Sequence, residues 1–208
     1  MFFCFDGVDG VGKSTQIGLL TKLLSEQNGE VVTCRDPGTT PLGEKLRGLL
    51  LDRHGMSIHR RSEMLMYMAA RAQMVEEVIR PAIEAGKHVI SDRFLLANVV
   101  YQGWAGGLSR EEILAVGEVT VAGIKPDLNI ILDMPADAAG KRIQREPDRM
   151  EAQGLAYMER VREGFLQEAK IDPQHVIVVN AARSIEEVHA DVRRAALRVL
   201  QGLSPQEN

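Results

Sequence analysis

Short apolar runs alternate with longer stretches in which apolar residues recur at helical spacing, from one end of the chain to the other. The apolar runs predict strands at residues 2–5, 31–34, 87–91, 128–132 and 175–179. The longer stretches predict helices near residues 13–26, 42–51, 61–85, 109–122, 136–143, 156–169 and 184–200. Alternating strands and helices are typical of a parallel sheet with helices on both faces. We therefore predict an α/β fold of three layers, α/β/α, around a five-stranded parallel sheet.

Turn and capping residues mark several of the predicted helix ends. Asn28 and Gly29 form a helix-stop signal after the first helix. Ser109 and Ser184 are expected to be N-caps, because a serine hydroxyl can accept a hydrogen bond from a free N–H of the first turn. Pro81 lies inside the long helix at 61–85 and should bend it, since proline has no N–H to donate.

The composition is that of an ordinary globular protein, with 45% apolar and 26% charged residues in a chain of 208. We expect a single domain over residues 1–208. The net charge of −4 argues against a general nucleic-acid binder, which is usually basic. Cys4 and Cys34 stand in apolar runs and are expected to be buried free thiols. Without a signal pattern or a membrane-length apolar stretch, we expect a cytoplasmic protein and no membrane partner.

The strongest chemical signal is the stretch from Gly7 to Ser14, which lies between the first predicted strand and the first predicted helix. Strand, glycine-rich turn and helix are the context of a phosphate-binding P-loop. Its backbone N–H groups and the helix N-terminus favour an anion, Lys13 can reach phosphate oxygens, and the Ser14 hydroxyl can bind Mg²⁺. The alternative is a glycine-rich turn that holds no nucleotide.

Polar residues also follow the next two strands. Arg35 and Asp36 follow the strand at 31–34, and Asp92 and Arg93 follow the strand at 87–91. Ligands bind at the carboxyl ends of parallel strands, which makes these residues site candidates. An acidic residue such as Asp92 is where a P-loop enzyme places a second contact to Mg²⁺, often through water. Arg93 suits a phosphate, whereas the first loop alone could be an ordinary polar turn.

Two helical segments carry weaker candidates. Tyr67 and Arg71 are four residues apart and share a helix face, where they could hold a base or form an ordinary surface pair. Asn98, Tyr101 and Gln102 lie on a further helix and could contact a base and a sugar, although each is more often structural when taken singly. The methionines of the helix at 61–85 are typical of core or dimer surface rather than of a ligand site.

A basic segment lies late in the chain. Four cations fall between Lys141 and Arg149, where Pro147 interrupts the helical pattern. Such a run is usually a solvated face, but in a P-loop enzyme it can be a mobile lid that supplies charge for phosphate transfer. We place a short lid at about residues 142–152.

Several stretches together resemble the thymidylate kinase family of P-loop nucleoside-monophosphate kinases, and they follow the family's order over nearly the whole chain. They are residues 5–16 with the P-loop, 35–47 with Arg-Asp-Pro-Gly, 69–73 with Ala-Arg-Ala-Gln, 91–94 with Ser-Asp-Arg-Phe, 101–103 with Tyr-Gln-Gly, 125–128 and 148–151. The P-loop alone indicates only a nucleotide phosphate, whereas the other motifs are more specific. The resemblance implies a P-loop nucleoside triphosphate hydrolase-like fold.

The resemblance implies transfer of the γ-phosphate of ATP to dTMP, giving dTDP and ADP, a step in dTTP synthesis for DNA replication. It implies Mg²⁺ as cofactor, held by Ser14 and Asp92, and a homodimer formed through helix faces. The implied catalytic residues are Asp9, Lys13, Arg93, Arg145 and Arg149. ATP would be bound by Gly7, Val8, Asp9, Gly10, Val11, Gly12, Lys13, Ser14, Thr15 and, beside the adenine, Arg142. The acceptor dTMP would be bound by Asp9, Arg35, Pro37, Tyr67, Arg71, Arg93, Asn98, Tyr101 and Gln102.

The sequence departs from the family's pattern at several positions. Asp36 replaces the usual Glu, Phe94 often is Tyr, and Tyr67 stands where Phe is common. The segment after Trp104 lacks a common arginine, and the lid is short. Some members carry an arginine inside the P-loop where this chain has Gly10, so the lid arginines become the natural source of transition-state charge.

Two expectations follow from the family's pattern. Arg149→Ala should lower kcat far more than it weakens ATP binding. The family also suggests a cis Asp36–Pro37 bond, whereas bonds before proline are ordinarily trans.

Three other functions are compatible with a P-loop. One is a kinase of another nucleotide or of a deoxynucleoside on the same fold. Another is a regulatory ATP-binding switch without an acceptor, against which the arginines after two strands and the basic lid argue. A nucleic-acid-binding ATPase is disfavoured by the acidic balance of the chain.

Overall fold

A computed structural model describes residues 1–52 and 55–206. Its sheet has the order β2-β3-β1-β4-β5, and every neighbouring pair is parallel. The strands are β1 (Phe2–Asp6), β2 (Val31–Arg35), β3 (His88–Asp92), β4 (Leu128–Asp133) and β5 (Val176–Asn180). The predicted five-stranded parallel sheet is confirmed, with each strand within a residue or two of its expected bounds.

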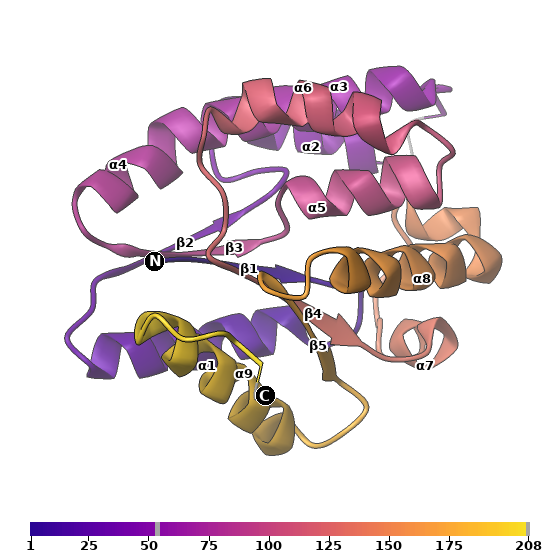
Figure 1. Ribbon diagram of the computed structural model, residues 1–208. Helices are drawn as coiled ribbons and strands as arrows, with labels where there is room; N and C mark the ends of the chain where they lie inside the picture. The colour runs from indigo at the N-terminus through magenta and orange to yellow at the C-terminus, as the bar shows by residue number, and fades with distance from the viewer. Residues whose placement is uncertain (53–54, 207–208) are drawn as a thin grey trace.

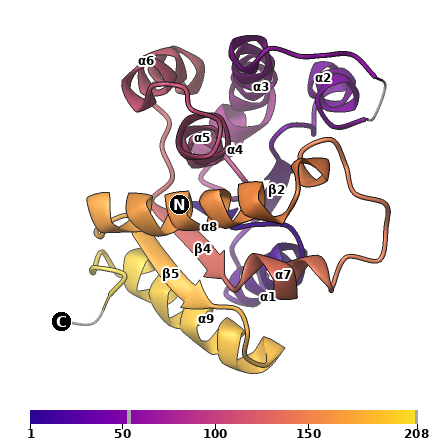
Figure 2. The same cartoon turned by 90° about the vertical axis from the view of Figure 1, so that its right-hand side faces the viewer.

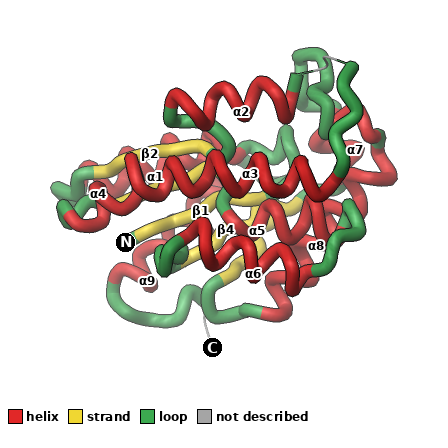
Figure 3. The backbone as a smooth tube through the Cα atoms, turned by 90° about the horizontal axis from the view of Figure 1, so that it is seen from above, coloured by secondary structure: helices red, strands yellow, loops and turns green. Residues whose placement is uncertain are grey.

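Helices cover both faces of this sheet (Figure 1). One face carries α1 (Lys13–Glu26) and α9 (Ile185–Leu200). The other face carries α3 (Arg60–Met74), α4 (Arg80–Glu84), α5 (Leu95–Asn98), α6 (Arg110–Val121) and α8 (Leu155–Ile171). The shorter α2 (Pro41–Leu51) packs beside α3, and α7 (Ala136–Gly140) beside α8 (Figure 3). The three-layer α/β/α fold is therefore confirmed.

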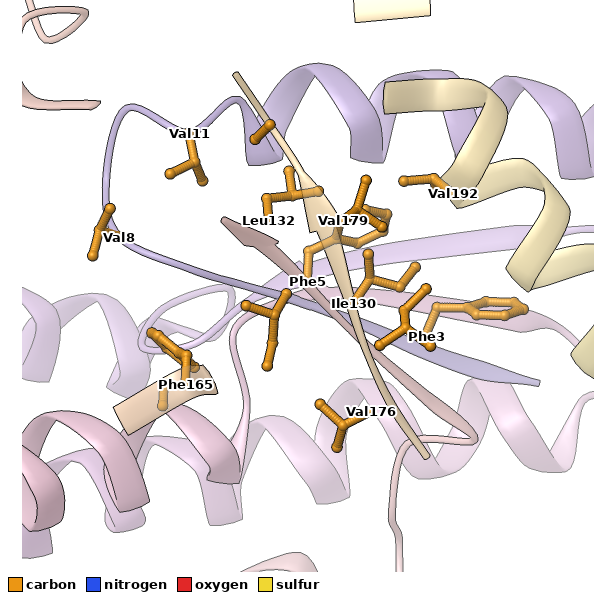
Figure 4. Packing of buried hydrophobic residues seen from close by; sticks show 14 of the residues in the cluster. Phe3, Phe5, Val8, Val11, Ile130, Leu132, Phe165, Val176, Val179 and Val192 are labelled. Atoms are coloured by element: carbon orange, nitrogen blue, oxygen red, sulfur yellow. The ribbon is translucent and has the colours of Figure 1, made fainter. Parts of the chain in front are cut away.

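The central strand β1 is fully buried and supplies apolar side chains to both layers. Side chains alternate across a strand, so Phe3 and Phe5 join one cluster, whereas Phe2 and Cys4 join another with Met74 of α3. Figure 4 shows Phe3 and Phe5 among the side chains of β4, β5 and α9. A strand buried on both faces reads as a continuous apolar run, and this explains the pattern of residues 2–5.

The long helix expected at 61–85 is not one regular helix. Between α3 and α4 the chain makes a π-helical turn at Val75–Ile79, immediately before the segment that contains Pro81. A π turn accommodates a break in the i→i−4 hydrogen-bond pattern, and proline makes such a break because it lacks an N–H. A second π turn, Val99–Trp104, continues α5 and carries Tyr101 and Gln102.

The predicted helix ends are largely confirmed. The Ser109 hydroxyl accepts a hydrogen bond from the Glu112 N–H, and Ser184 forms a reciprocal capping box with Glu187. Asn28, after α1, adopts the left-handed conformation that ends helices. In the part of the chain that the structure describes, no helix combines the length and the apolarity that a membrane crossing requires.

Candidate active site

The P-loop connects β1 to α1 at the carboxyl edge of the sheet. Gly7, Gly10 and Gly12 all have positive φ angles, of 126°, 87° and 98°. L-residues rarely adopt this conformation, and glycine does so without a Cβ clash. The turn leads directly into the first turn of α1, whose free N–H groups and positive dipole end favour an anion. The predicted strand–turn–helix context of the P-loop is therefore present.

Two of these glycines also have no room for a side chain. A Cβ on Gly7 would lie 2.4 Å from the Leu132 carbonyl oxygen, and one on Gly10 would lie 2.1 Å from that of Ala139. A Cβ on Gly12 would meet nothing within 4 Å. The contact with Ala139 leaves no room for a side chain at position 10 in this conformation.

Lys13 is buried at the start of α1, and its ammonium group points back into the loop. Its Nζ lies 3.1 Å from the Gly7 oxygen, 3.0 Å from the Val8 oxygen and 3.2 Å from Asp9 Oδ1. The lysine is thus held over the concave side of the turn, where phosphate oxygens would accept its hydrogen bonds. Ser14 and Thr15 follow it and are exposed.

Asp9 joins the P-loop to β3. Besides Lys13, it binds Arg93 Nη2 at 2.9 Å. Burial would raise the pKa of the Asp9 carboxyl, but the charges of Lys13 and Arg93 outweigh that effect and hold its pKa well below the usual range. Asp9 is therefore an anion between two cations at the junction of the two halves of the site.

A cavity lies beside the P-loop, at the carboxyl ends of β2 and β3. All nine residues expected to bind the acceptor line it: Asp9, Arg35, Pro37, Tyr67, Arg71, Arg93, Asn98, Tyr101 and Gln102. It is also lined by Asp36, Arg47, Leu51, Asp92, Ala97, Arg145, Asp148 and Met150. We call it the acceptor cavity. The fold brings together segments that are more than a hundred residues apart in the sequence.

Arg71 forms the buried end of the acceptor cavity. Its Nε binds Asp36 Oδ2 at 2.6 Å, and its Nη2 binds the Phe94 carbonyl at 3.2 Å and the Asn98 side-chain oxygen. Burial raises the pKa of Asp36, and Arg71 offsets part of that effect. The Asp36–Pro37 bond is cis, as the family's pattern suggests. The aspartate here is long enough to reach Arg71, although the family usually has Glu.

Arg93 occupies the opposite end, next to the P-loop. It has a positive φ of 70°, and its guanidinium lies 4.9 Å from the centroid of the Tyr101 ring. Its Nη2 binds Asp9, while its Nη1 is buried and has no hydrogen-bond partner among the described residues. This buried donor is free to bind an oxygen of a ligand or of water.

A divalent cation could be held at two places, by Asp92 or by a group of three other carboxylates. Asp92 has a buried Oδ1 that makes no hydrogen bond within the described chain, which fits the expectation that it faces a metal or a metal-bound water. Carboxylate oxygens of Asp9, Asp148 and Glu151 lie within 4.8 Å of one another. The sequence reasoning did not single out this second group, whose members come from the P-loop and the lid.

Residues 142–152, where a lid is expected, run between α7 and α8 and overlap the short 3-10 helix Glu151–Gln153 (Figure 2). Arg145 borders the acceptor cavity and pairs with Glu151 at 2.7 Å. Arg149 is directed elsewhere: it binds Glu63 of α3 and the carbonyl oxygen at the end of α2. Arg142 lies by the loop after β5, 3.5 Å from the Ala181 oxygen. The two lid arginines therefore have different surroundings.

Besides Asp148 and Glu151, sequence reasoning missed two polar residues, Arg47 and Glu63. Arg47 of α2 lines the acceptor cavity and donates to the Pro37 oxygen at 3.0 Å. Glu63 of α3 lies behind the cavity wall and is fully buried. Arg47 belongs to a stretch that resembles the family, so the signal for it was present. Glu63 has no such signal, because a glutamate near the start of an amphipathic helix reads as surface.

A P-loop that opens beside a second cavity lined by arginines defines a P-loop phosphotransferase with separate donor and acceptor sites. The family model for thymidylate kinase matches residues 5–192. The chain is 46% identical to the thymidylate kinase of Symbiobacterium thermophilum, with 96% of this chain and 94% of that protein covered. It is 40% identical to the thymidylate kinase of Kosmotoga olearia, with 98% of each covered.

Its structure resembles the crystal structure of thymidylate kinase from Ehrlichia chaffeensis, with a TM-score of 0.77 and 31% identity over 94% of this chain and 98% of that one. The chain belongs to the thymidylate kinase family. The protein is thus an ATP-dependent nucleoside-monophosphate kinase, whose reaction converts dTMP to dTDP, and the expected P-loop fold is confirmed.

Proposed function

We propose that the acceptor cavity holds dTMP while the P-loop holds Mg-ATP, so that the two phosphates meet near Asp9. The observation that carries this proposal is the single cavity that collects all nine expected acceptor residues and ends at the P-loop. Lys13 and Arg93 both contact Asp9, so the donor and acceptor sites share one anion.

The two ends of the acceptor cavity suit different parts of dTMP. Tyr67, Arg71, Asn98 and Gln102 offer a ring face and hydrogen-bonding groups, which suit the base and the sugar. Ala97, Leu51 and Met150 add apolar surface that a thymine methyl requires. Arg93 contacts Asp9 of the P-loop, where it would bind the acceptor phosphate, and Arg35 lines the same cavity from the end of β2.

Phosphoryl transfer needs positioning and neutralisation of charge more than covalent participation. Lys13 would bind the oxygens of the donor phosphates. Arg93 has an unpartnered Nη1 and would bind the acceptor phosphate. Arg145 would leave its ion pair with Glu151 and bind the phosphoryl group during transfer. Since Gly10 leaves no arginine in the P-loop, the arginines would come from the residue after β3 and from the segment at 142–152.

The residues present fit a magnesium ion. Ser14 could ligate it directly, and the unpartnered Oδ1 of Asp92 could bind it or its water. The ion would neutralise charge on the phosphate oxygens. Adenine would lie beside Arg142 and the Ala181 loop.

We also propose a homodimer formed through α3 and α6. These helices pack together on the outside of the molecule (Figure 1). Leu65 and Ala69 on α3, and Ala115 and Val119 on α6, are exposed at i, i+4 spacing. Val119 is 80% exposed, which is unusual for a large apolar side chain. The enzyme would act in the cytoplasm, where ATP and dTMP occur together.

The test is the release of ADP from Mg-ATP with dTMP, dUMP, UMP, dCMP, AMP, GMP or thymidine as acceptor. We expect strong stimulation by dTMP. Preference for another monophosphate would keep the P-loop assignment and overturn the thymine site. ATP binding without stimulation by any acceptor would favour a regulatory switch.

A further inference from the structure

A chain of hydrogen bonds connects the buried end of the acceptor cavity to a carboxylate that does not line it. The Arg71 guanidinium donates to Asn98 Oδ1. Asn98 Nδ2 donates to Gln102 Oε1 at 2.7 Å, and Gln102 Nε2 donates to Glu63 Oε1 at 2.9 Å. Both amides line the cavity, whereas Glu63 is fully buried behind them.

The two ends of this chain fix its direction. A guanidinium can only donate hydrogen bonds, and a carboxylate can only accept them. Reversing the Asn98 amide would set its NH₂ group against the donors of Arg71. Reversing Gln102 would set its carbonyl oxygen against the Glu63 carboxylate. Each reversal sets a buried donor against a donor or a buried acceptor against an acceptor, which is unfavourable.

Glu63 is held in place by more than Gln102. Arg60 Nη1 lies 3.3 Å from Oε1, and Arg149 of the lid binds Oε2. Two arginines offset the charge of a carboxylate that would otherwise be costly to bury. The carboxylate is thus a fixed acceptor at the back of the cavity wall.

Amide direction matters because the pyrimidines differ in donor and acceptor pattern. Thymine presents an N–H at N3 and an oxygen at C4, whereas cytosine presents a bare nitrogen at N3 and an amino group at C4. Each amide keeps one free N–H and one free oxygen lone pair once its partners in the chain are satisfied. With both amides locked, the cavity presents one pattern, and a base of the opposite pattern leaves buried groups unpaired.

We propose that Glu63 is a positioning residue that fixes the amide direction of Gln102, and with it the preference of the acceptor cavity for thymine over cytosine. Arg71 fixes Asn98 from the other end. The inference rests on the placement of dTMP in this cavity. It assigns to Glu63 an effect on base selection that burial alone would not produce.

The test compares dTMP with 5-methyl-dCMP, which keeps the methyl group and changes only the pattern at N3 and C4. A glutamine at position 63 can donate as well as accept, so Gln102 would lose one of the two constraints on its direction. We expect Glu63→Gln to lower the ratio of kcat/KM for dTMP over 5-methyl-dCMP about tenfold, the loss of one buried polar match. The contribution of Arg71 would remain.

Glu168→Gln is the matched control. Glu168 is also a buried glutamate bonded to an arginine and to a neutral N–H donor, Arg110 and Trp104, but it does not line the acceptor cavity. It should leave the ratio within twofold. An unchanged ratio in a folded Glu63→Gln enzyme, whatever its kcat or KM, would show a merely structural role and overturn the proposal.

If Glu63→Gln does not fold, Glu63→Asp replaces it. The shorter side chain withdraws the carboxylate from Gln102 while keeping its charge, and an unchanged ratio again overturns the proposal. Equal use of dTMP and 5-methyl-dCMP by the wild-type enzyme would refute it without any variant. Failure to phosphorylate dTMP at all would instead refute the acceptor assignment.

Discussion

At the scale of single residues, Gly10 and Gly12 illustrate two different reasons why a position in the loop requires glycine: a positive φ and a close backbone contact. Both have positive φ, but only Gly10 touches another backbone, that of Ala139. Gly12→Ala should cost about 1–2 kcal/mol of unfolding free energy through φ strain. Gly10→Ala should cost about 1–3 kcal/mol more, because Ala139 must move. Urea unfolding of both variants without nucleotide measures the difference, and equal losses would contradict it.

The burial of Asp6 at the end of β1 leads us to expect that the stability of the protein depends on pH. It is fully buried, its Oδ1 has no partner in the described chain, and burial raises its pKa to about 7. Between the unfolded pKa near 4 and this value, the unfolded state loses the proton and the folded state keeps it. Titration of Asp6 therefore leaves the free energy of unfolding at its full value below about pH 4. It lowers that free energy by up to about 4 kcal/mol as the pH rises to about 7.

Asp6→Asn should remove that loss. The measurement is the difference in unfolding free energy between wild type and variant at steps from pH 4 to 8, which cancels the titration of other groups. The difference should shift in favour of the variant as pH rises and level off above pH 7. A constant difference over this range would show that Asp6 titrates normally in the folded protein.

The sequence was informative about residues whose chemistry is local. Lys13 follows the glycine-rich loop, Arg93 follows β3, and Arg71 stands in a specific motif, so their place at this edge of the sheet could be predicted. Glu63 could not, because its burial depends on Gln102 and Arg149, which lie 39 and 86 residues further along the chain. A charged residue on an amphipathic helix reads as surface until its distant partners are known.

At the scale of elements, Arg149 ties the lid to α2 and α3. Arg149→Ala should still lower kcat far more than it weakens ATP binding, by about tenfold or more, since the lid would lose its anchor on Glu63 and the end of α2. Arg162→Ala is the control, because Arg162 pairs with Asp133 away from the acceptor cavity. An unchanged kcat, measured with saturating substrates, would remove Arg149 from the mechanism.

Element types were more predictable than their internal geometry. Strands and caps follow from local patterns, such as the serine N-caps of α6 and α9. The π turn at Val99–Trp104 leaves no comparable pattern, yet it places Gln102 where Asn98 can bond to it. The turn contacts α3, α6 and α8, and those contacts are not local in sequence.

At the scale of the whole molecule, the proposed homodimer would bury the exposed face of α3 and α6 against a second copy. An arginine there would be buried against a second copy without a partner, which costs several kcal/mol. Val119→Arg and Leu65→Arg should therefore convert the protein to a monomer at micromolar concentration. Sedimentation velocity measures the change directly.

Ile171→Arg is the matched control, since Ile171 is also more than half exposed but lies at the end of α8. It should leave the dimer intact. Dimers that survive both Val119→Arg and Leu65→Arg would move the interface to another face, and a monomeric wild type would refute the dimer itself.

Because α3 carries Tyr67, Glu63 and Arg71 on its inner side, a dimer formed across its outer side would brace the acceptor cavity from behind. The interface variants should then also raise KM for dTMP, while Ile171→Arg should not.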